Sequence, residues 1–188
     1  MSVPAGVTEV GVSATANTWA FGDMVGVGAP YGDAGQLSAL IGKPAPDFEL
    51  KTLEGDTFKL GDSLGKEVVV LDFWATWCHP CVIELPLVGK VTAERADKGV
   101  AFFAVNTGES GKVVTKFLEK KKLDVPLVLD DDGAIASAYG VGALPHLVII
   151  DAEGTVRHVH LGSGPGTEER LGAELDALLP LGGQTGGR

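Results

Sequence analysis

Cys78 and Cys81 are separated by two residues and are the only cysteines in this chain of 188 residues. They follow the strand-like apolar run 68–73, and a helix that begins near His79 would place Cys78 at its N-terminus. Unpaired N–H groups and the helix dipole favour negative charge there, so a thiolate is the expected form of Cys78. Cys81, less than one turn further on, is placed to attack a mixed disulfide formed at Cys78. The pattern predicts thiol–disulfide exchange.

A zinc site is the main alternative for the same two cysteines. A structural zinc site needs four ligands, usually from a second cysteine pair or from spaced histidines, and this chain has no further cysteine. His158 and His160 alternate on an expected strand and share a face, but without a nearby carboxylate or thiol they favour a partly exposed strand face. We therefore expect no metal, and no cofactor besides a redox-active Cys78–Cys81 disulfide.

His79 lies between the two cysteines, and two interpretations of it stay open. As an imidazolium it would stabilise the neighbouring Cys78 thiolate. As an exposed polar residue it would have little effect, because water and salt screen its charge.

The sequence around the cysteines carries a family resemblance. Residues 72–81 read Asp-Phe-Trp-Ala-Thr-Trp-Cys-His-Pro-Cys, which resembles the active-site stretch of the thioredoxin superfamily. The continuation to Pro86 gives Cys-x-Pro-Cys-x-x-Glu-x-Pro, which is similar to the TlpA/ResA-type oxidoreductases, a mostly extracytoplasmic bacterial branch of redoxin (AhpC-TSA-like) proteins. Residues 41–48 resemble the Gly-x-x-Ala-Pro-x-Phe segment that this branch shares with the peroxiredoxins. The likeness covers roughly residues 41–180.

The resemblance implies roles for residues around the pair. Pro145 corresponds to the cis-proline that faces the cysteines and presents backbone to substrate, and His146 after it is expected to point into the sheet. Trp77 and Pro80, like His79, are expected to modulate the site. Cys78 is expected to be exposed and to act as nucleophile, with a shielded resolving partner.

Two carboxylates are candidates for the proton acceptor. Asp72 resembles the buried aspartate of thioredoxin, and Glu84 resembles the active-site glutamate of the TlpA/ResA branch. Glu84 lies one helical turn from Cys81, on the same helical face. A buried carboxylate has a raised pKa and can accept a proton near neutrality. A solvated Glu84 without such a role is the alternative.

The resemblance implies a thiol-disulfide oxidoreductase that exchanges protein disulfides, as a reductant in a pathway such as cytochrome c maturation. Its partners would be protein disulfide substrates and an upstream electron donor protein. A thiol peroxidase is a weaker alternative, because Leu71 and Ala75 stand where the Pro-x-x-x-Thr-x-x-Cys peroxidase pattern needs Pro and Thr. A copper-binding chaperone is also weaker, because related copper carriers use Cys-x-x-x-Cys spacing with a distant histidine.

Composition limits the partners and the compartment. A net charge of −10 argues against a nucleic-acid surface, and no apolar stretch reaches the length of a membrane span. The first 42 residues contain no Lys or Arg, so a signal peptide is not expected in this chain. The resemblance implies a periplasmic or extracytoplasmic protein, with a cytoplasmic one left open, and a monomer is expected.

The chain divides into an expected linker or poorly ordered extension (1–40), a thioredoxin-like α/β domain (41–180) and a disordered tail (181–188). We expect a central mixed sheet flanked by helices, with an N-terminal strand pair and an inserted α–β unit between residues 107 and 130. The expected strands are a pair within 48–60, then 68–75, 100–105, 125–129, 147–151 and 155–161. The expected helices are 79–98, 112–122, 133–139 and 168–179.

Overall fold

The computed structural model describes residues 39–179, so nearly all of the expected N-terminal extension and the whole expected tail lie outside the described residues. The strands are β1 (Glu49–Thr52), β2 (Thr57–Lys59), β3 (Val68–Trp74), β4 (Val100–Thr107), β5 (Leu127–Asp130), β6 (His146–Ile150) and β7 (Val156–Leu161). The helices are α2 (Leu60–Ser63), α3 (His79–Ala93), the 3₁₀ turn η1 (Ala96–Lys98), α4 (Gly111–Lys121), α5 (Ala134–Ala138) and α6 (Thr167–Leu178).

One seven-stranded mixed sheet has the order β2-β1-β5-β4-β3-β6-β7. Strands β3, β4 and β5 run parallel, and β6 lies antiparallel to β3 on its other side. The antiparallel pair β1–β2 extends the sheet beyond β5, and the inserted unit is α4 with β5. The predicted fold class is therefore confirmed.

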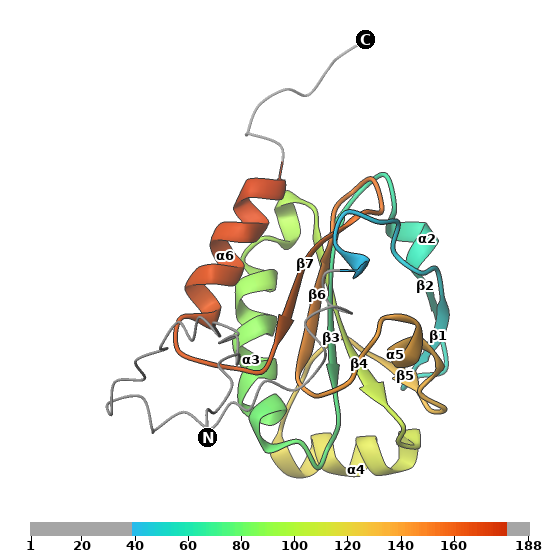
Figure 1. Cartoon of the computed structure of the whole chain (residues 1–188). Helices are drawn as coiled ribbons and strands as arrows, with labels where there is room; N and C mark the ends of the chain where they lie inside the picture. The colour runs from blue at the N-terminus through green and yellow to red at the C-terminus, as the bar shows by residue number, and fades with distance from the viewer. Residues whose placement is uncertain (1–38, 180–188) are drawn as a thin grey trace, which may run out of the picture.

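Helices cover both faces of the sheet. Figure 1 shows α3 and α6 side by side on one face, with α2 and α5 on the other. Strand β3 is buried along its whole length, which explains its nearly continuous apolar sequence. Its side chains alternate: Val70 and Trp74 join the cluster that includes the α3 and α6 side chains, whereas Leu71 and Phe73 join the opposite cluster. Asp72 therefore projects towards α3.

Several predicted boundaries were wrong: β4 runs on to Thr107 rather than ending at residue 105, and two others have a clear physical cause. The helix expected over 79–98 ends at Ala93, because Arg95 leaves the helical conformation at φ −120° and ψ 2° and a separate 3₁₀ turn follows. Gly99 then closes that turn in the left-handed region at φ 95°. Strand β5 begins at Leu127 rather than at residue 125, since Pro126 has no N–H to give to a ladder.

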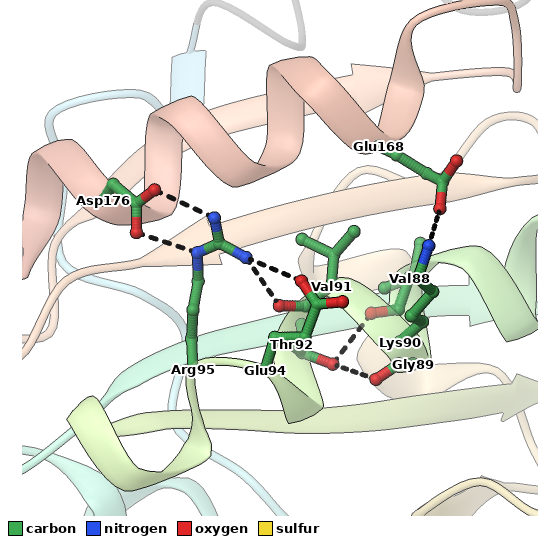
Figure 2. Close-up of polar contacts among 9 residues, drawn as sticks. All are labelled: Val88, Gly89, Lys90, Val91, Thr92, Glu94, Arg95, Glu168 and Asp176. Atoms are coloured by element: carbon green, nitrogen blue, oxygen red, sulfur yellow. Dashed lines mark hydrogen bonds and ion pairs between the residues drawn. The ribbon is translucent and has the colours of Figure 1, made fainter.

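Polar contacts hold α6 against α3 (Figure 2). The Arg95 guanidinium donates from Nε and Nη2 to the two carboxylate oxygens of Asp176, both at 2.8 Å. Nearer the start of α6, Lys90 Nζ donates to Glu168 Oε1 at 3.2 Å. Exposed pairs of this kind stabilise little, but a bidentate arginine fixes geometry. The contacts orient α6 so that its other side faces the sheet edge.

The segment that precedes β1 lies along the turn between β6 and β7. Gly42 N–H donates to the Val156 carbonyl at 2.8 Å, and Ala45 N–H donates to the Gly154 carbonyl at 2.8 Å. This contact lies at the far end of β6 from His146. Within residues 39–179, no helix has the length and apolar character needed to cross a membrane.

Candidate active site

Cys78 and Cys81 form a disulfide, with their Cα atoms 5.3 Å apart. Cys78 is the N-cap residue of α3, and Pro80 lies in the first turn, where a missing N–H leaves no helical hydrogen bond unmade. The Cys81 N–H donates to Cys78 Sγ at 3.3 Å. The helix N-terminus therefore presents both a dipole and an N–H group to the first sulfur, as the sequence predicted.

The two cysteines differ less in exposure than expected. Cys78 is 4% exposed and Cys81 is fully buried, so Cys78 is the more accessible of the two although little of its surface meets solvent. The surrounding residues are far more open: Trp77 is 73% exposed and Ile83 is 54% exposed, and both His79 and Pro80 are exposed. Exposed apolar side chains thus flank the disulfide on both sides in the sequence.

Asp72 and Glu84 are both buried beneath this end of α3. Within residues 39–179, neither carboxylate oxygen of Asp72 has a hydrogen-bond partner, and Glu84 Oε2 also has none. Burial raises the pKa of Asp72 well above its ordinary value, and the nearby Glu84 charge raises it further. Burial raises the pKa of Glu84 to about 7, against a smaller lowering by the charge of Arg170. The solvated alternative for Glu84 is wrong, because α3 turns it inward with Cys81 and Leu85.

The Leu144–Pro145 peptide bond is cis, as the resemblance implied, and the Pro145 carbonyl accepts from Gly162 N–H at 2.9 Å. His146 pairs with Phe73 across β3 and β6, so Pro145 lies beside the end of β3 that leads to the cysteines. The His146 side chain is fully buried, as expected, and meets the Phe73 ring edge-on. Burial lowers the pKa of His146 to about 4, so its ring is neutral at physiological pH.

A third carboxylate, Glu109, fixes the loop before Cys78. Its oxygens accept from Thr76 N–H at 2.7 Å, from Thr76 Oγ1 at 2.5 Å and from Asn106 Nδ2 at 2.9 Å. This role of Glu109 was not predicted from the sequence. The only sequence signal is the three-residue spacing of Asn106 and Glu109 after a strand, and nothing local connects them to a residue 33 positions earlier.

The expectation for His158 and His160 was wrong in one respect. Helix α6 brings Glu174 to both rings: His160 Nε2 lies 2.7 Å from Glu174 Oε2, and His158 Nδ1 lies 3.7 Å from Glu174 Oε1. The pair on the strand therefore does have a nearby carboxylate, from a helix rather than from its own strand.

The known proteins that this chain resembles are redoxins and thiol-disulfide oxidoreductases. The Redoxin family model matches residues 40–175. Thiol-disulfide oxidoreductase ResA of Geobacillus thermodenitrificans is 39% identical over 145 residues, which cover 77% of this chain and 82% of that protein. Thioredoxin-like protein YneN of Bacillus subtilis is 40% identical over 138 residues, which cover 72% of this chain and 79% of that protein.

Among solved structures, a putative thiol:disulfide interchange protein DsbE from Chlorobium tepidum has the same fold. It matches with a TM-score of 0.69 and 35% identity, over 74% of this chain and 98% of that chain.

Proposed function

Because the chain belongs to the redoxin family and is a thiol-disulfide oxidoreductase, we propose that it exchanges protein disulfides with Cys78 as nucleophile and Cys81 as resolving thiol. The observation that carries these roles is the position of Cys78 as N-cap of α3, with the Cys81 N–H donated to its sulfur. A thiolate at Cys78 would receive that N–H and the helix dipole, whereas Cys81 lies inside the first turn, without exposure.

The first step is attack of the Cys78 thiolate on one sulfur of a substrate disulfide. A bond forms between the attacking and attacked sulfurs, and the other substrate sulfur leaves as a thiolate that takes a proton. In the second step Cys81 loses its proton and attacks Cys78 Sγ. The second substrate sulfur then leaves as a thiolate and is protonated, so two electrons have passed to the substrate and the Cys78–Cys81 disulfide remains.

A buried base is needed because Cys81 is shielded from water. Glu84 follows Cys81 by three residues on the same inward face of α3, and a carboxyl with a pKa of about 7 can accept and release a proton near neutrality. Asp72, on the strand below, shares the same surroundings and is coupled to Glu84. We assign the proton transfer to this pair of carboxyls, with Glu84 as the group nearer to Cys81 in the helix.

Protein substrates would dock on the exposed apolar side chains around the disulfide. Trp77 at 73% and Ile83 at 54% exposure offer a site for an extended apolar segment next to the reacting sulfur. The cis bond before Pro145 lies at the same end of the sheet, where its backbone can contact substrate. An upstream protein donor would return electrons to the disulfide through the same surface.

Membership of the redoxin family supports a proposal for the direction of electron flow and for the compartment. We propose that the protein reduces its partners in an extracytoplasmic compartment. The reduction potential of the Cys78–Cys81 couple, measured against glutathione, tests the direction: a value near that of thioredoxin, at about −270 mV, supports a reductant, and a value near that of DsbA, at about −120 mV, opposes it. Cell fractionation of the native gene product tests the compartment.

The role assignment is tested by trapping. The reduced Cys81→Ser variant should accumulate a mixed disulfide through Cys78 with a substrate peptide that contains a disulfide, and Cys78→Ser should accumulate none. In a parallel measurement, alkylation of the reduced chain near neutral pH should label Cys78 first. Earlier labelling of Cys81, or trapping through Cys81 in the Cys78→Ser variant, reverses the assignment.

The docking surface is tested with Trp77→Ala. Reduction of insulin should slow several-fold, whereas reduction of a small aromatic disulfide should change little. Ile41→Ala is the matched control, because Ile41 is 48% exposed but adjoins the β6–β7 turn, away from the disulfide. Equal slowing with both substrates would assign Trp77 to the chemistry rather than to docking.

A further inference from the structure

The edge of the sheet carries a cluster of potential metal ligands that the thiol chemistry does not use. His158 and His160 stand on β7, the last strand of the sheet, and Glu174 stands on α6. One ligand atom from each of the three side chains lies within 4.8 Å of the others. We propose that these three residues bind one divalent transition-metal ion of the zinc class, which links β7 to α6.

The positions of the two histidines follow from the strand register. His158 pairs with Ile149 and His160 pairs with Leu147, and those two partners belong to the cluster beneath α3 and α6. Both imidazoles therefore project to the face of the sheet that α3 and α6 cover. Their rings are nearly parallel, with an interplanar angle of 9° and centroids 6.2 Å apart, so they lie side by side opposite one carboxylate.

The distances suit a metal of zinc size. Zinc bonds to imidazole nitrogen and carboxylate oxygen are about 2.0–2.2 Å long, so tetrahedral ligand atoms lie about 3.3–3.5 Å apart. His160 Nε2 lies 2.7 Å from Glu174 Oε2 and His158 Nδ1 lies 3.7 Å from Glu174 Oε1, so the distances to the two carboxylate oxygens fall on either side of that separation. Small side-chain rotations would bring both to it, and a set of two histidines and one glutamate leaves a fourth position for water.

The partial exposure of the three side chains and the fixed position of α6 also favour a metal site. The side chains of His158, His160 and Glu174 are 37%, 19% and 17% exposed, so an ion can enter while the ligands remain confined. The Arg95–Asp176 contact holds α6 in place from its other side, two residues from Glu174 (Figure 2).

One feature of the site opposes a cation. Arg170 lies close enough for its charge to lower the pKa of His160, so it also repels a bound metal ion. A hydrogen bond between His160 and Glu174 is the competing role of the cluster, and it would tie β7 to α6 without any metal. The metal-binding role predicts that added Zn²⁺ binds the cluster and raises the melting temperature, whereas the hydrogen-bonding role predicts neither.

The experiment uses the full oxidised chain, because the disulfide removes both thiols as ligands. Titration with Zn²⁺ by calorimetry should show one site per chain, with no binding of Mg²⁺, which prefers oxygen ligands. Zn²⁺ should also raise the melting temperature. The single variants His158→Gln, His160→Gln and Glu174→Gln should each weaken Zn²⁺ binding at least tenfold, and Arg170→Gln should tighten it several-fold.

His79→Gln is the matched control, since His79 is an exposed histidine at the start of α3 and should leave Zn²⁺ binding unchanged. If a variant fails to fold, histidine-ring NMR of the wild-type chain replaces it. Zn²⁺ should then shift the His158 and His160 signals and leave those of His79 and His146 in place. No Zn²⁺ binding, binding retained when His158 and His160 are both replaced, or NMR shifts confined to His79 would overturn the proposal.

Discussion

Replacement of Glu84 by glutamine tests the buried carboxyl through protein stability. An unfolded chain ionises this group near its ordinary pKa of 4.5, whereas burial raises the pKa in the folded chain to about 7. Below 4.5 the group is protonated in both states and does not affect stability. Between 4.5 and about 7 the unfolded state loses the proton first, so wild-type stability falls as the pH rises through this window.

The size of the effect follows from the two pKa values. Each tenfold change in proton affinity corresponds to about 1.4 kcal/mol. The rise in pKa from 4.5 to about 7 therefore lowers the free energy of unfolding of the wild type by about 3 kcal/mol above pH 7, relative to acid. Glutamine has a similar shape and does not titrate. Glu84→Gln should therefore raise the free energy of unfolding by about 3 kcal/mol at pH 8 and leave it within about 1 kcal/mol of wild type at pH 4.

The assay is guanidinium unfolding of the oxidised chain at pH 4 and pH 8, with the free energy taken from linear extrapolation. Glu119→Gln is the control, because Glu119 is an exposed glutamate on α4 and should change stability little at either pH. A difference between Glu84→Gln and wild type that is equal at the two pH values would refute the reasoning, as would a variant less stable than wild type at pH 8.

The other predictions concern the residues around the disulfide. Asp72→Asn should raise the free energy of unfolding at neutral pH, because it removes a buried carboxyl whose pKa is raised, and the gain measured by denaturation should disappear in acid. Glu109→Ala should lower the free energy of unfolding by about 1–3 kcal/mol and slow insulin reduction, because it leaves the Thr76 N–H without its acceptor; unchanged stability would contradict this. His79→Gln should make the reduction potential more negative by about 10–30 mV if an imidazolium stabilises the Cys78 thiolate, and an unchanged potential would leave His79 a surface residue.

The parts of the site that could be predicted from sequence are those set by local geometry. The placement of Cys78 as N-cap depends only on a strand, a short turn and a helix that starts at the next residue. Glu84 faces inward because it is one turn from Cys81, and the alternation along β3 gives Asp72 the same side. The motif fixes all of these within 13 residues, 72–84.

The parts that could not be predicted depend on contacts between distant segments. The Thr76–Glu109 hydrogen bonds join residues 33 positions apart, and the His160–Glu174 contact joins a strand to a helix 14 positions away. No periodicity carries such information, because the first contact depends on how the loop between β4 and α4 lies beside the loop before Cys78, and the second depends on how α6 lies across the sheet edge. The limited exposure of Cys78 was missed for a related reason: its burial depends on tertiary packing and not on its place in the helix.

The two carboxyls below the disulfide are explained better by chemistry than by stability. Within the described residues, both Asp72 oxygens and Glu84 Oε2 lack hydrogen-bond partners. Burial in the apolar cluster around α3 raises the free energy needed to ionise each of the two acids. We expect the uncharged amide of matching size, asparagine for Asp72 and glutamine for Glu84, to make a more stable core above neutral pH. An amide could not take a proton at the moment that Cys81 must lose one. Since the pKa of Glu84 is about 7, its carboxyl can accept or release a proton near neutrality. The cost in folding stability of burying the two acids is therefore explained by their place beside Cys81, the thiol that needs a base.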